Sequence, residues 1–89
     1  MNHLDKHNAI SRKELTVLKC LEDNTVEASI ELTQISVSTG IRDRDEVLRA
    51  LYTLEGKNLA QPSPEGDLTS NQWKITNDGV RALRLFANG

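Results

Sequence analysis

The chain has 89 residues, which is enough for one compact domain and excludes a second catalytic lobe. Hydrophobic residues make up 37% of it and charged residues 27%, and its aromatic residues are Trp73, Tyr52 and Phe86. This composition fits a small soluble domain with an aliphatic core. Because a chain of this size buries only about 60 to 65% of its unfolded surface, a role at the surface is favoured over a deep substrate pocket.

The sequence carries no signal for a membrane or for secretion. No apolar run approaches the roughly 18 to 20 residues that span a bilayer, and residues 1–10 contain no charged-then-apolar leader. We therefore expect a cytoplasmic protein with no membrane partner. The single cysteine, Cys20, cannot form an internal disulfide. Since no histidine or second cysteine is near it in sequence, Cys20 is predicted to lie in the core rather than to act as a reactive thiol.

The charge balance argues against a simple electrostatic attraction to nucleic acid. Lysine and arginine total 11, aspartate and glutamate total 13, and the formal net charge is -2, whereas nucleic-acid-binding domains often carry a basic excess. The charges are unevenly distributed, because residues 21–41 hold four acids and no cation while residues 73–89 hold three cations and one acid. One face of the domain could therefore still be locally positive.

The first helix is predicted to begin at Ser11. Residues 1–10 are polar without an apolar period and predict a flexible N-terminal tail, so the folded domain is expected over residues 11–89. Ser11 and Glu14 match a capping box, in which each side chain accepts from the other residue's backbone N–H. Leucines at helical spacing continue the helix to about residues 23–24. A short strand is expected around residues 29–31.

Two helices joined by a short turn are predicted next. The apolar spacing predicts a helix over residues 32–39, and Gly40 suits the left-handed conformation that ends it. Asp43 and Glu46 repeat the N-cap signature and predict a third helix that ends near Gly56. The apolar residues of this helix fall on one face and are predicted to be buried: Val47, Ala50, Leu51 and Leu54.

The last third of the chain predicts a hairpin and a final helix. Asn58 can adopt a left-handed conformation that leads into an edge strand over residues 59–61. Residues 72–76 alternate polar and apolar side chains as a half-buried strand does, and residues 62–67 between the strands are rich in turn formers. Thr76 can cap the last helix, whose core-facing residues are predicted to be Val80, Leu83 and Phe86.

This order of elements resembles the winged helix-turn-helix superfamily over about residues 11–86. Residues 35–41 (ISVSTGI) resemble its second helix and turn, and residues 47–59 (VLRALYTLEGKNL) are similar to its recognition helix and exit, with Asn58 where the family usually has glycine. Residues 73–79 (WKITNDG) are similar to the pattern with which many bacterial members leave the wing. The resemblance implies an α+β fold with a three-helix core, a two-stranded wing, a short third strand and a C-terminal helix.

The resemblance also implies that the third helix enters a major groove of duplex DNA and reads base edges with its outward face. If the apolar stripe points inward, the outward residues are Arg44, Asp45, Leu48, Arg49 and Tyr52. Arginine donates two hydrogen bonds to guanine or pairs with a phosphate, and a tyrosine hydroxyl can reach a phosphate. The residues expected to bind DNA are Arg42, Arg44, Arg49, Tyr52 and Lys74.

Acidic residues oppose this interpretation. Residues 42–57 hold four cations and four acids, so the segment has no net attraction for a polyanion. The alternative is a solvated helix face on which the arginines pair with Asp45 and Glu46, each pair stabilising the helix by about a few tenths of a kcal/mol. DNA-binding relatives usually offer arginine or lysine at the tip of the wing, whereas this chain has Glu65 and Asp67 there.

Three further residues are expected to bind a partner. An outward Leu48 could meet a thymine methyl group, belong to a protein-binding or dimer patch, or lie half-buried against the second helix. Two cations of the last helix could contact phosphates or a partner. The residues expected to bind a partner are Leu48, Arg81 and Arg84.

No pattern supports an enzyme. His3 and His7 have helical spacing but no third metal ligand follows, and no phosphate-binding glycine loop, nucleophile elbow or other histidine is present. We expect no catalytic residue, no metal site and no cofactor. The leading hypothesis is a transcriptional regulator or accessory factor that binds duplex DNA as a homodimer or beside a protein partner. The alternative is a protein-binding adaptor that uses the same face without DNA.

Overall fold

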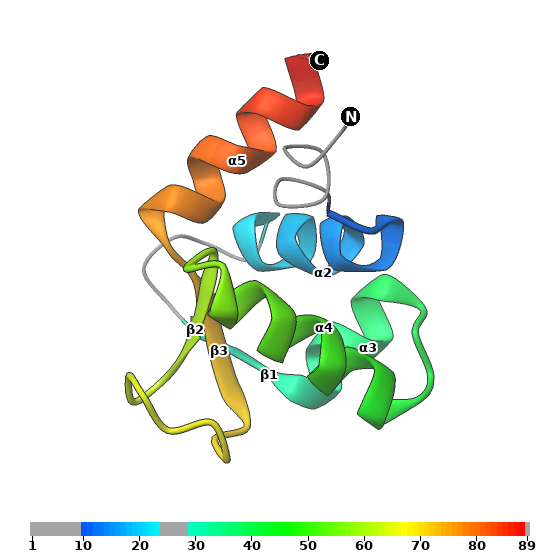
Figure 1. Cartoon of the computed structure of the whole chain (residues 1–89). Coiled ribbons are helices and arrows are strands. Elements are labelled where there is room, and N and C mark those ends of the chain that lie inside the picture. Colours follow the sequence, from blue (N-terminus) through cyan, green and yellow to red (C-terminus); the bar gives the residue numbers. More distant parts are fainter. Residues whose placement is uncertain (1–9, 24–28, 89) are drawn as a thin grey trace.

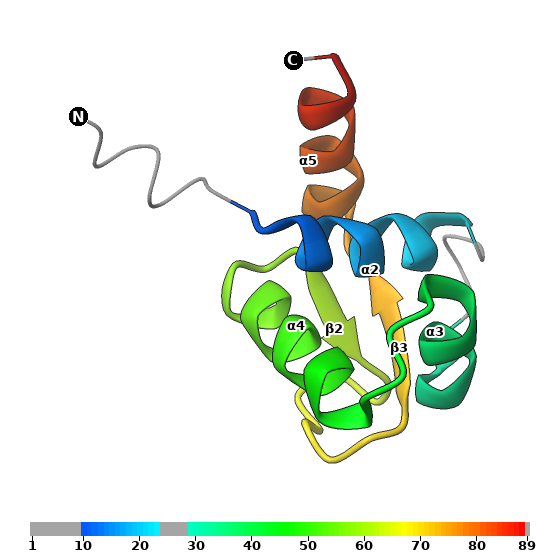
Figure 2. The ribbon, with the colours of Figure 1, turned by 90° about the vertical axis from the view of Figure 1, so that its right-hand side faces the viewer.

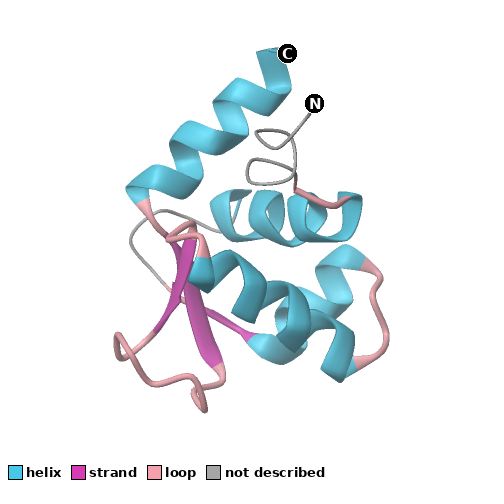
Figure 3. Ribbon diagram, viewed as in Figure 1, coloured by secondary structure: helices cyan, strands magenta, loops and turns pink. Residues whose placement is uncertain are grey.

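The computed structural model describes residues 10–23 and 29–88. In this part of the chain, helices and a small antiparallel sheet alternate in the order α2 (Arg12–Asp23), β1 (Ile30–Glu31), α3 (Leu32–Thr39), α4 (Arg44–Gly56), β2 (Ala60–Pro62), β3 (Gln72–Ile75) and α5 (Asn77–Asn88) (Figures 1 and 3). This is the winged helix-turn-helix order and confirms the predicted α+β fold. The predicted tail lies outside the described residues except for its last residue, and His3 and His7 lie outside them as well.

Helix α2 begins at the predicted capping box. The Ser11 backbone N–H donates to Glu14 Oε1 over 3.3 Å, and the Glu14 backbone N–H donates to Ser11 Oγ over 3.1 Å. The same Glu14 oxygen accepts from Lys57 Nζ at 3.3 Å. The cap that starts α2 therefore also ties this helix to the residue that follows α4.

In the turn between α3 and α4, the residues predicted to end α3 and to cap α4 do so, but one predicted capping contact does not form. Gly40 ends α3 with a φ of 78°, and its backbone N–H donates to Ser36 O at 3.0 Å. Asp43 caps α4 by accepting from the Asp45 backbone N–H at 2.9 Å. Glu46 was predicted to complete this capping box, but its carboxylate accepts from Lys13 Nζ at 3.1 Å instead. The physical reason is that α2 brings a full positive charge within reach, which attracts a carboxylate more strongly than a backbone dipole does.

The sheet has the strand order β1-β3-β2, and both strand pairs are antiparallel. Trp73 of the central strand β3 lies opposite Ile30 of β1 and Pro62 of β2. Its side chain has no exposed surface, and its indole N–H donates to Ser70 O at 3.1 Å. The sheet therefore closes one side of the core around a single buried aromatic ring.

Strand β2 is an edge strand, as predicted, but it begins one residue later than residues 59–61. Asn58 reverses the chain with a φ of 63°, as its residue type suggested. Leu59 is excluded from the strand because its backbone N–H donates to Leu54 O at 2.9 Å and closes α4. Strand β3 likewise ends before Thr76, because this residue caps the next helix rather than extending the strand.

One aliphatic core lies between the helices and the sheet. Helix α2 packs against α3, α4, α5 and the central strand β3, so it lies at the centre of the described packing (Figure 2). Cys20 lies in this core, as predicted. The side chains that are almost completely buried include Val17, Leu18, Leu21, Ile35, Val47, Leu51, Leu54 and Trp73.

Helix α5 is capped as predicted but is only partly buried. Thr76 Oγ1 accepts from the Gly79 backbone N–H at 2.9 Å. Leu83 is 8% exposed and Val80 packs against the core, whereas Phe86, which was predicted to face the core, is 42% exposed. The reason is geometric: the N-terminal half of α5 lies over α2, and its C-terminal half extends away from the domain (Figures 1 and 2).

Gly79 allows α5 to start close to the backbone that precedes β2. A Cβ atom at this position would lie 2.2 Å from Leu59 O and 2.6 Å from Ile75 Cγ1. Gly79→Ala must therefore displace the helix or the chain beneath it, and we expect the free energy of unfolding to fall by about 1–3 kcal/mol. Urea denaturation followed by circular dichroism measures this loss.

Gly56→Ala is the matched control. A Cβ atom at Gly56 would meet nothing within 4 Å, and this residue is the last of α4. Because alanine has the higher helix propensity, the control should be as stable as the wild type or more stable by up to about 1 kcal/mol. If Gly79→Ala were also as stable as the wild type, the close contact between α5 and Leu59 would be disproved.

Candidate nucleic-acid interface

Helix α4 presents one apolar face to the core and one polar face to the solvent. The predicted apolar stripe is buried: Val47, Ala50, Leu51 and Leu54 are 0–4% exposed. Arg44, Asp45 and Arg49 are exposed on the other side, and Arg42 is exposed in the preceding turn. With 13 residues, the helix is roughly 20 Å long. It therefore offers a straight, accessible polar surface at one side of the domain (Figure 2).

Two hydrogen bonds hold the loop between β2 and β3 alongside α4. From here on, the wing means this loop, residues 63–71, without the two strands that flank it. Arg44 Nη2 donates to Asn71 Oδ1 at 3.0 Å, and the Tyr52 hydroxyl donates to Leu68 O at 3.1 Å. Since the two donors are about two turns apart on α4, they fix the wing beside the helix along much of its length (Figure 1). Sequence reasoning missed Asn71 and Leu68 because neither belongs to a local motif.

Tyr52, which was predicted to reach a phosphate with its hydroxyl, makes two contacts inside the domain. Its ring lies against Trp73, with the ring centroids 6.0 Å apart and the planes at 53°. Its hydroxyl proton is already donated to Leu68 O, and a phosphate oxygen would need that same donor. Tyr52 is 43% exposed, so it forms part of the surface while it supports the wing.

The acidic residues near α4 are partly neutralised within the domain. Glu46 pairs with Lys13, and Asp43 accepts a backbone hydrogen bond at the helix start. Both members of the Lys13–Glu46 pair are about half exposed, so the pair itself stabilises the fold by only about 0.2–1 kcal/mol. Its larger consequence is that it offsets one negative charge beside the exposed arginines.

The alternative of local ion pairs on α4 is wrong for the arginines. Among the described residues, none of Arg42, Arg44 and Arg49 lies within 4.0 Å of an Asp45 or Glu46 carboxylate oxygen. The reason is that Arg44 reaches the wing and Glu46 reaches α2. The exposed guanidinium groups of Arg42 and Arg49 are therefore available to an external anion.

The tip of the wing is acidic, as the sequence predicted. Asp67 stabilises the loop itself, because its carboxylate accepts from the Thr69 backbone N–H at 3.0 Å and from the Thr69 hydroxyl. Glu65 is exposed, and Gly66 beside it has a φ of 88°. The tip thus presents a carboxylate and no cation, which disfavours its approach to a phosphate backbone.

The remaining predicted residues are spread over several parts of the domain. Leu48 is half-buried and packs against the core, which agrees with one of the three alternatives for it. Lys74 alternates along β3 with buried neighbours and so lies on the outer face of the sheet. Arg81 pairs with Asp78 at 3.6 Å, and Arg84 is exposed. Both arginines belong to α5, at the end of the domain opposite the wing (Figures 1 and 2), so the structure does not bring them to the exposed face of α4.

The described residues contain no evident centre for metal chemistry. Over residues 10–23 and 29–88, no three side chains of histidine, cysteine, aspartate or glutamate gather where a metal ion could bind. In the same ranges, no helix has both the length and the apolar character that crossing a bilayer requires.

Comparison with solved structures finds proteins with a similar fold. A structure of BpsR from Bordetella bronchiseptica, described with the regulation of its DNA binding by 6-hydroxynicotinic acid, has a TM-score of 0.71 and 19% identity. A MarR-family transcriptional regulator from Silicibacter pomeroyi has a TM-score of 0.68 and 15% identity. The alignments cover 96% and 93% of this chain. At such identities the likeness shows the winged-helix fold.

This chain spans 66% of the BpsR chain and 54% of the Silicibacter pomeroyi chain. In sequence comparisons, no protein-family model and no curated protein matches it. Nothing in the comparisons favours the protein-binding adaptor.

Tyr52→Phe tests the link between α4 and the wing. The change keeps the ring against Trp73 but leaves Leu68 O without its hydrogen-bond donor. We expect the free energy of unfolding to fall by about 0.5–1.5 kcal/mol and the backbone amides of the wing to exchange with solvent faster than in the wild type. Hydrogen exchange measured by mass spectrometry checks this, and an unchanged wing would contradict the link.

Cys20 is expected to react slowly with alkylating reagents in the folded protein. Burial raises the pKa of its thiol, a hydrogen bond with Ser38 lowers it, and the charge of Asp23 raises it further, so the net pKa is above the ordinary value. Because the thiolate is the nucleophile, alkylation at neutral pH should be slower than for a free cysteine and should become fast in denaturant. Mass spectrometry of timed alkylation measures both rates, and equal rates would contradict the buried position.

Proposed function

We propose that this chain is a DNA-binding regulator or accessory factor that reads duplex DNA with the exposed face of α4. The observation that carries the proposal is the exposed arginine surface on a helix whose opposite face is buried and whose fold is winged helix-turn-helix. The two structural neighbours, both described as DNA-binding or transcriptional regulators, support it. The proposal involves no catalysis and no cofactor, and it places the protein in the cytoplasm.

Shape and hydrogen-bonding chemistry favour the major groove as the target. The major groove is about 12 Å wide and admits an α-helix. Arg49 lies in the middle of the exposed face, and Arg44 lies in the first turn of α4. Both can donate to guanine N7 and O6 or to phosphate oxygens, with Arg42 and Lys74 as further phosphate contacts.

The proposed roles of Tyr52 and the wing follow from their contacts. Tyr52 acts as a positioning residue, because its hydroxyl holds Leu68 of the wing and its ring lies against Trp73. The proposal needs no close contact of the wing tip with DNA, since Glu65 would be repelled by the phosphates. Leu48, which is half-buried, can reach a thymine methyl group with the part of its side chain that stays exposed.

A single copy of this domain should bind DNA weakly. The net charge is -2, and few cations face the proposed interface, so few counterions are released on binding. Two linked copies, or one copy beside a DNA-binding partner, would raise the affinity through an increased effective concentration. We therefore propose that the protein acts on DNA as a dimer or in a complex.

Arg44→Glu combined with Arg49→Glu tests the proposed interface. A mobility-shift assay at low salt, with a pool of duplexes of random sequence, avoids any assumption about the preferred site. We expect the wild type to shift the pool and the double variant to lose at least roughly tenfold in affinity, because each lost guanidinium contact costs about 1–3 kcal/mol if it reaches a base. Wild-type binding should also weaken steeply as salt is raised.

Arg81→Glu is the control, because it reverses the charge of one arginine on α5, away from α4. Its affinity should stay close to that of the wild type. If the wild type failed to shift duplex DNA at low salt, the proposed function would be wrong. If Arg81→Glu weakened binding as much as the changes on α4, the assignment of the interface to α4 would be wrong.

A further inference from the structure

Two outward side chains of α4 have no partner in the described part of the chain. The other outward residues are engaged elsewhere, since Arg44 and Tyr52 hold the wing and Leu48 packs against the core. Asp45 and Arg49 are exposed. Within residues 10–23 and 29–88, their side chains form no hydrogen bond and no ion pair. Their polar groups are therefore available to an external molecule.

The negative charge of Asp45 is not matched by a cation of the domain. Among the described residues, no lysine or arginine nitrogen lies within 4.0 Å of its carboxylate. Lys13, which lies near the start of α4, is paired with Glu46 instead. Asp45 thus stands uncompensated on the face that is proposed to approach a polyanion.

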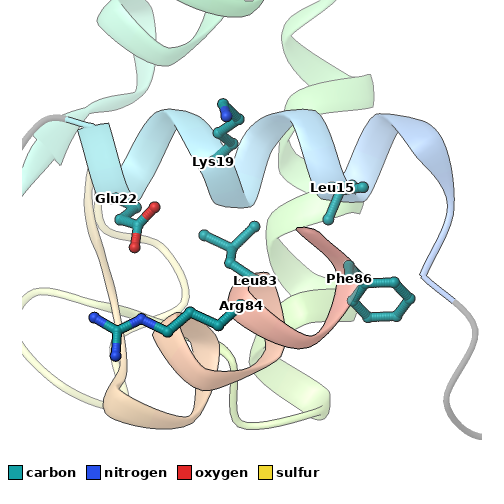
Figure 4. A pocket seen from close by; sticks show the side chains of 6 residues that line it. All are labelled: Leu15, Lys19, Glu22, Leu83, Arg84 and Phe86. Carbon is teal, nitrogen blue, oxygen red and sulfur yellow. The ribbon is translucent and has the colours of Figure 1, made fainter. Parts of the chain in front are cut away.

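Cations at the other end of the domain do not reach Asp45 either. Lys19 and Arg84 stand with Glu22 at the rim of an open apolar groove between α2 and α5, which has a volume of about 220 Å³ (Figure 4). Helix α5 lies at the end of the domain opposite the wing (Figures 1 and 2). The free carboxylate on α4 therefore needs a partner from outside the chain.

The spacing of Asp45 and Arg49 matches the stacking of base pairs. Asp45 is the second residue of α4, and Arg49 follows four residues later on the same face. They are separated by about 6 Å along the helix axis, and base pairs stack about 3.4 Å apart. The two side chains can therefore reach base pairs one or two steps apart. Residues near the start of a recognition helix contact base edges, and Asp45 has this position.

The chemistry of a carboxylate selects one base for Asp45. An ionised carboxylate only accepts hydrogen bonds, and the donors in the major groove are cytosine N4 and adenine N6. Adenine carries the acceptor N7 beside N6, which a carboxylate repels, whereas cytosine presents a donor alone. A guanidinium group, in contrast, donates to guanine O6 and N7. Asp45 therefore suits cytosine and Arg49 suits guanine.

We infer that Asp45 is a specificity-determining residue that accepts a hydrogen bond from cytosine N4, while Arg49 donates to a guanine one or two base pairs away. The inference rests on the proposed function and adds the class of duplex that is read, which is a site with two nearby G·C pairs. An unpaired carboxylate in the groove is repelled by the phosphates of every sequence. Only a site with the cytosine donor compensates for this repulsion, so Asp45 suppresses binding to other sequences.

Selection of bound duplexes from a random pool, followed by sequencing, tests the inference. The wild type should enrich sites with cytosine at one fixed position and guanine one or two base pairs away. Replacing this cytosine by thymine, with its complement, puts the acceptor O4 in place of the N4 donor. The change should weaken wild-type binding by about fivefold or more.

Asp45→Asn should change the selected base while it keeps the size of the side chain. An amide both donates and accepts, which matches adenine N6 and N7. We expect cytosine to be enriched less at this position and adenine more. Affinity for the unselected pool should rise by about twofold or more at low salt, because one negative charge is removed. Asp45→Ala should remove the preference at this position, and circular dichroism checks that both variants fold.

Glu65→Gln is the matched control. It also converts an exposed carboxylate to an amide, but at the tip of the wing, and it should leave the selected bases unchanged. The control separates base recognition from a general effect of charge. A purely structural role of Asp45, in which it stabilises the start of α4, would lower the stability of Asp45→Asn without changing the selected bases.

The outcomes separate this inference from the proposed function. A wild type that binds duplex DNA without enriching cytosine would overturn the inference alone, and so would a folded Asp45→Asn variant that selects the same bases as the wild type. A change of selected bases in Glu65→Gln equal to that in Asp45→Asn would also overturn it. A wild type that binds no duplex at low salt rejects the proposed function, and the inference with it.

Discussion

The arrangement of the domain depends on one packing contact, that between α2 and the apolar stripe of α4. Val47, Leu51 and Leu54 are 0% exposed, as are Val17 and Leu18 of α2. Burial of each such side chain stabilises the fold by about 1.5–3 kcal/mol, whereas an exposed ion pair between the two helices contributes about 0.2–1 kcal/mol. The apolar contact therefore fixes the rotation of α4. Once this rotation is fixed, Arg44 and Arg49 must face the solvent.

The same contact arranges the charges around the candidate interface. Because α2 crosses α4, Lys13 meets Glu46 near the start of α4 and Glu14 meets Lys57 just after its end. One acid of α4 is thereby neutralised, and the carboxylate of Asp43 is directed to the helix start. A chain with a net charge of -2 can thus still present exposed arginines on one face, because the distribution of charges decides the local potential more than their sum does.

Local chemistry explains which parts of the structure could be predicted. The caps at Ser11, Asp43 and Thr76 and the left-handed residues Gly40 and Asn58 act within a few positions of the chain, and their predictions were confirmed. Phe86 was mispredicted because helical spacing shows which residues share a face but not how far the neighbouring helix extends beneath them. The link between Tyr52 and the wing could not be predicted, because it joins residues 16 positions apart without any motif.

The sequence by itself determined the order of the elements, the buried stripe of α4 and the acidic tip of the wing, because these follow from side-chain periodicity and residue type over short distances. The tertiary structure alone decided which acids are neutralised, where the wing is attached and that α5 leaves an apolar groove with charges at its rim. The physical reason is that ion pairs, loop contacts and grooves arise between segments that meet only when the core has formed, and pairing over such distances leaves no periodic signal along the chain.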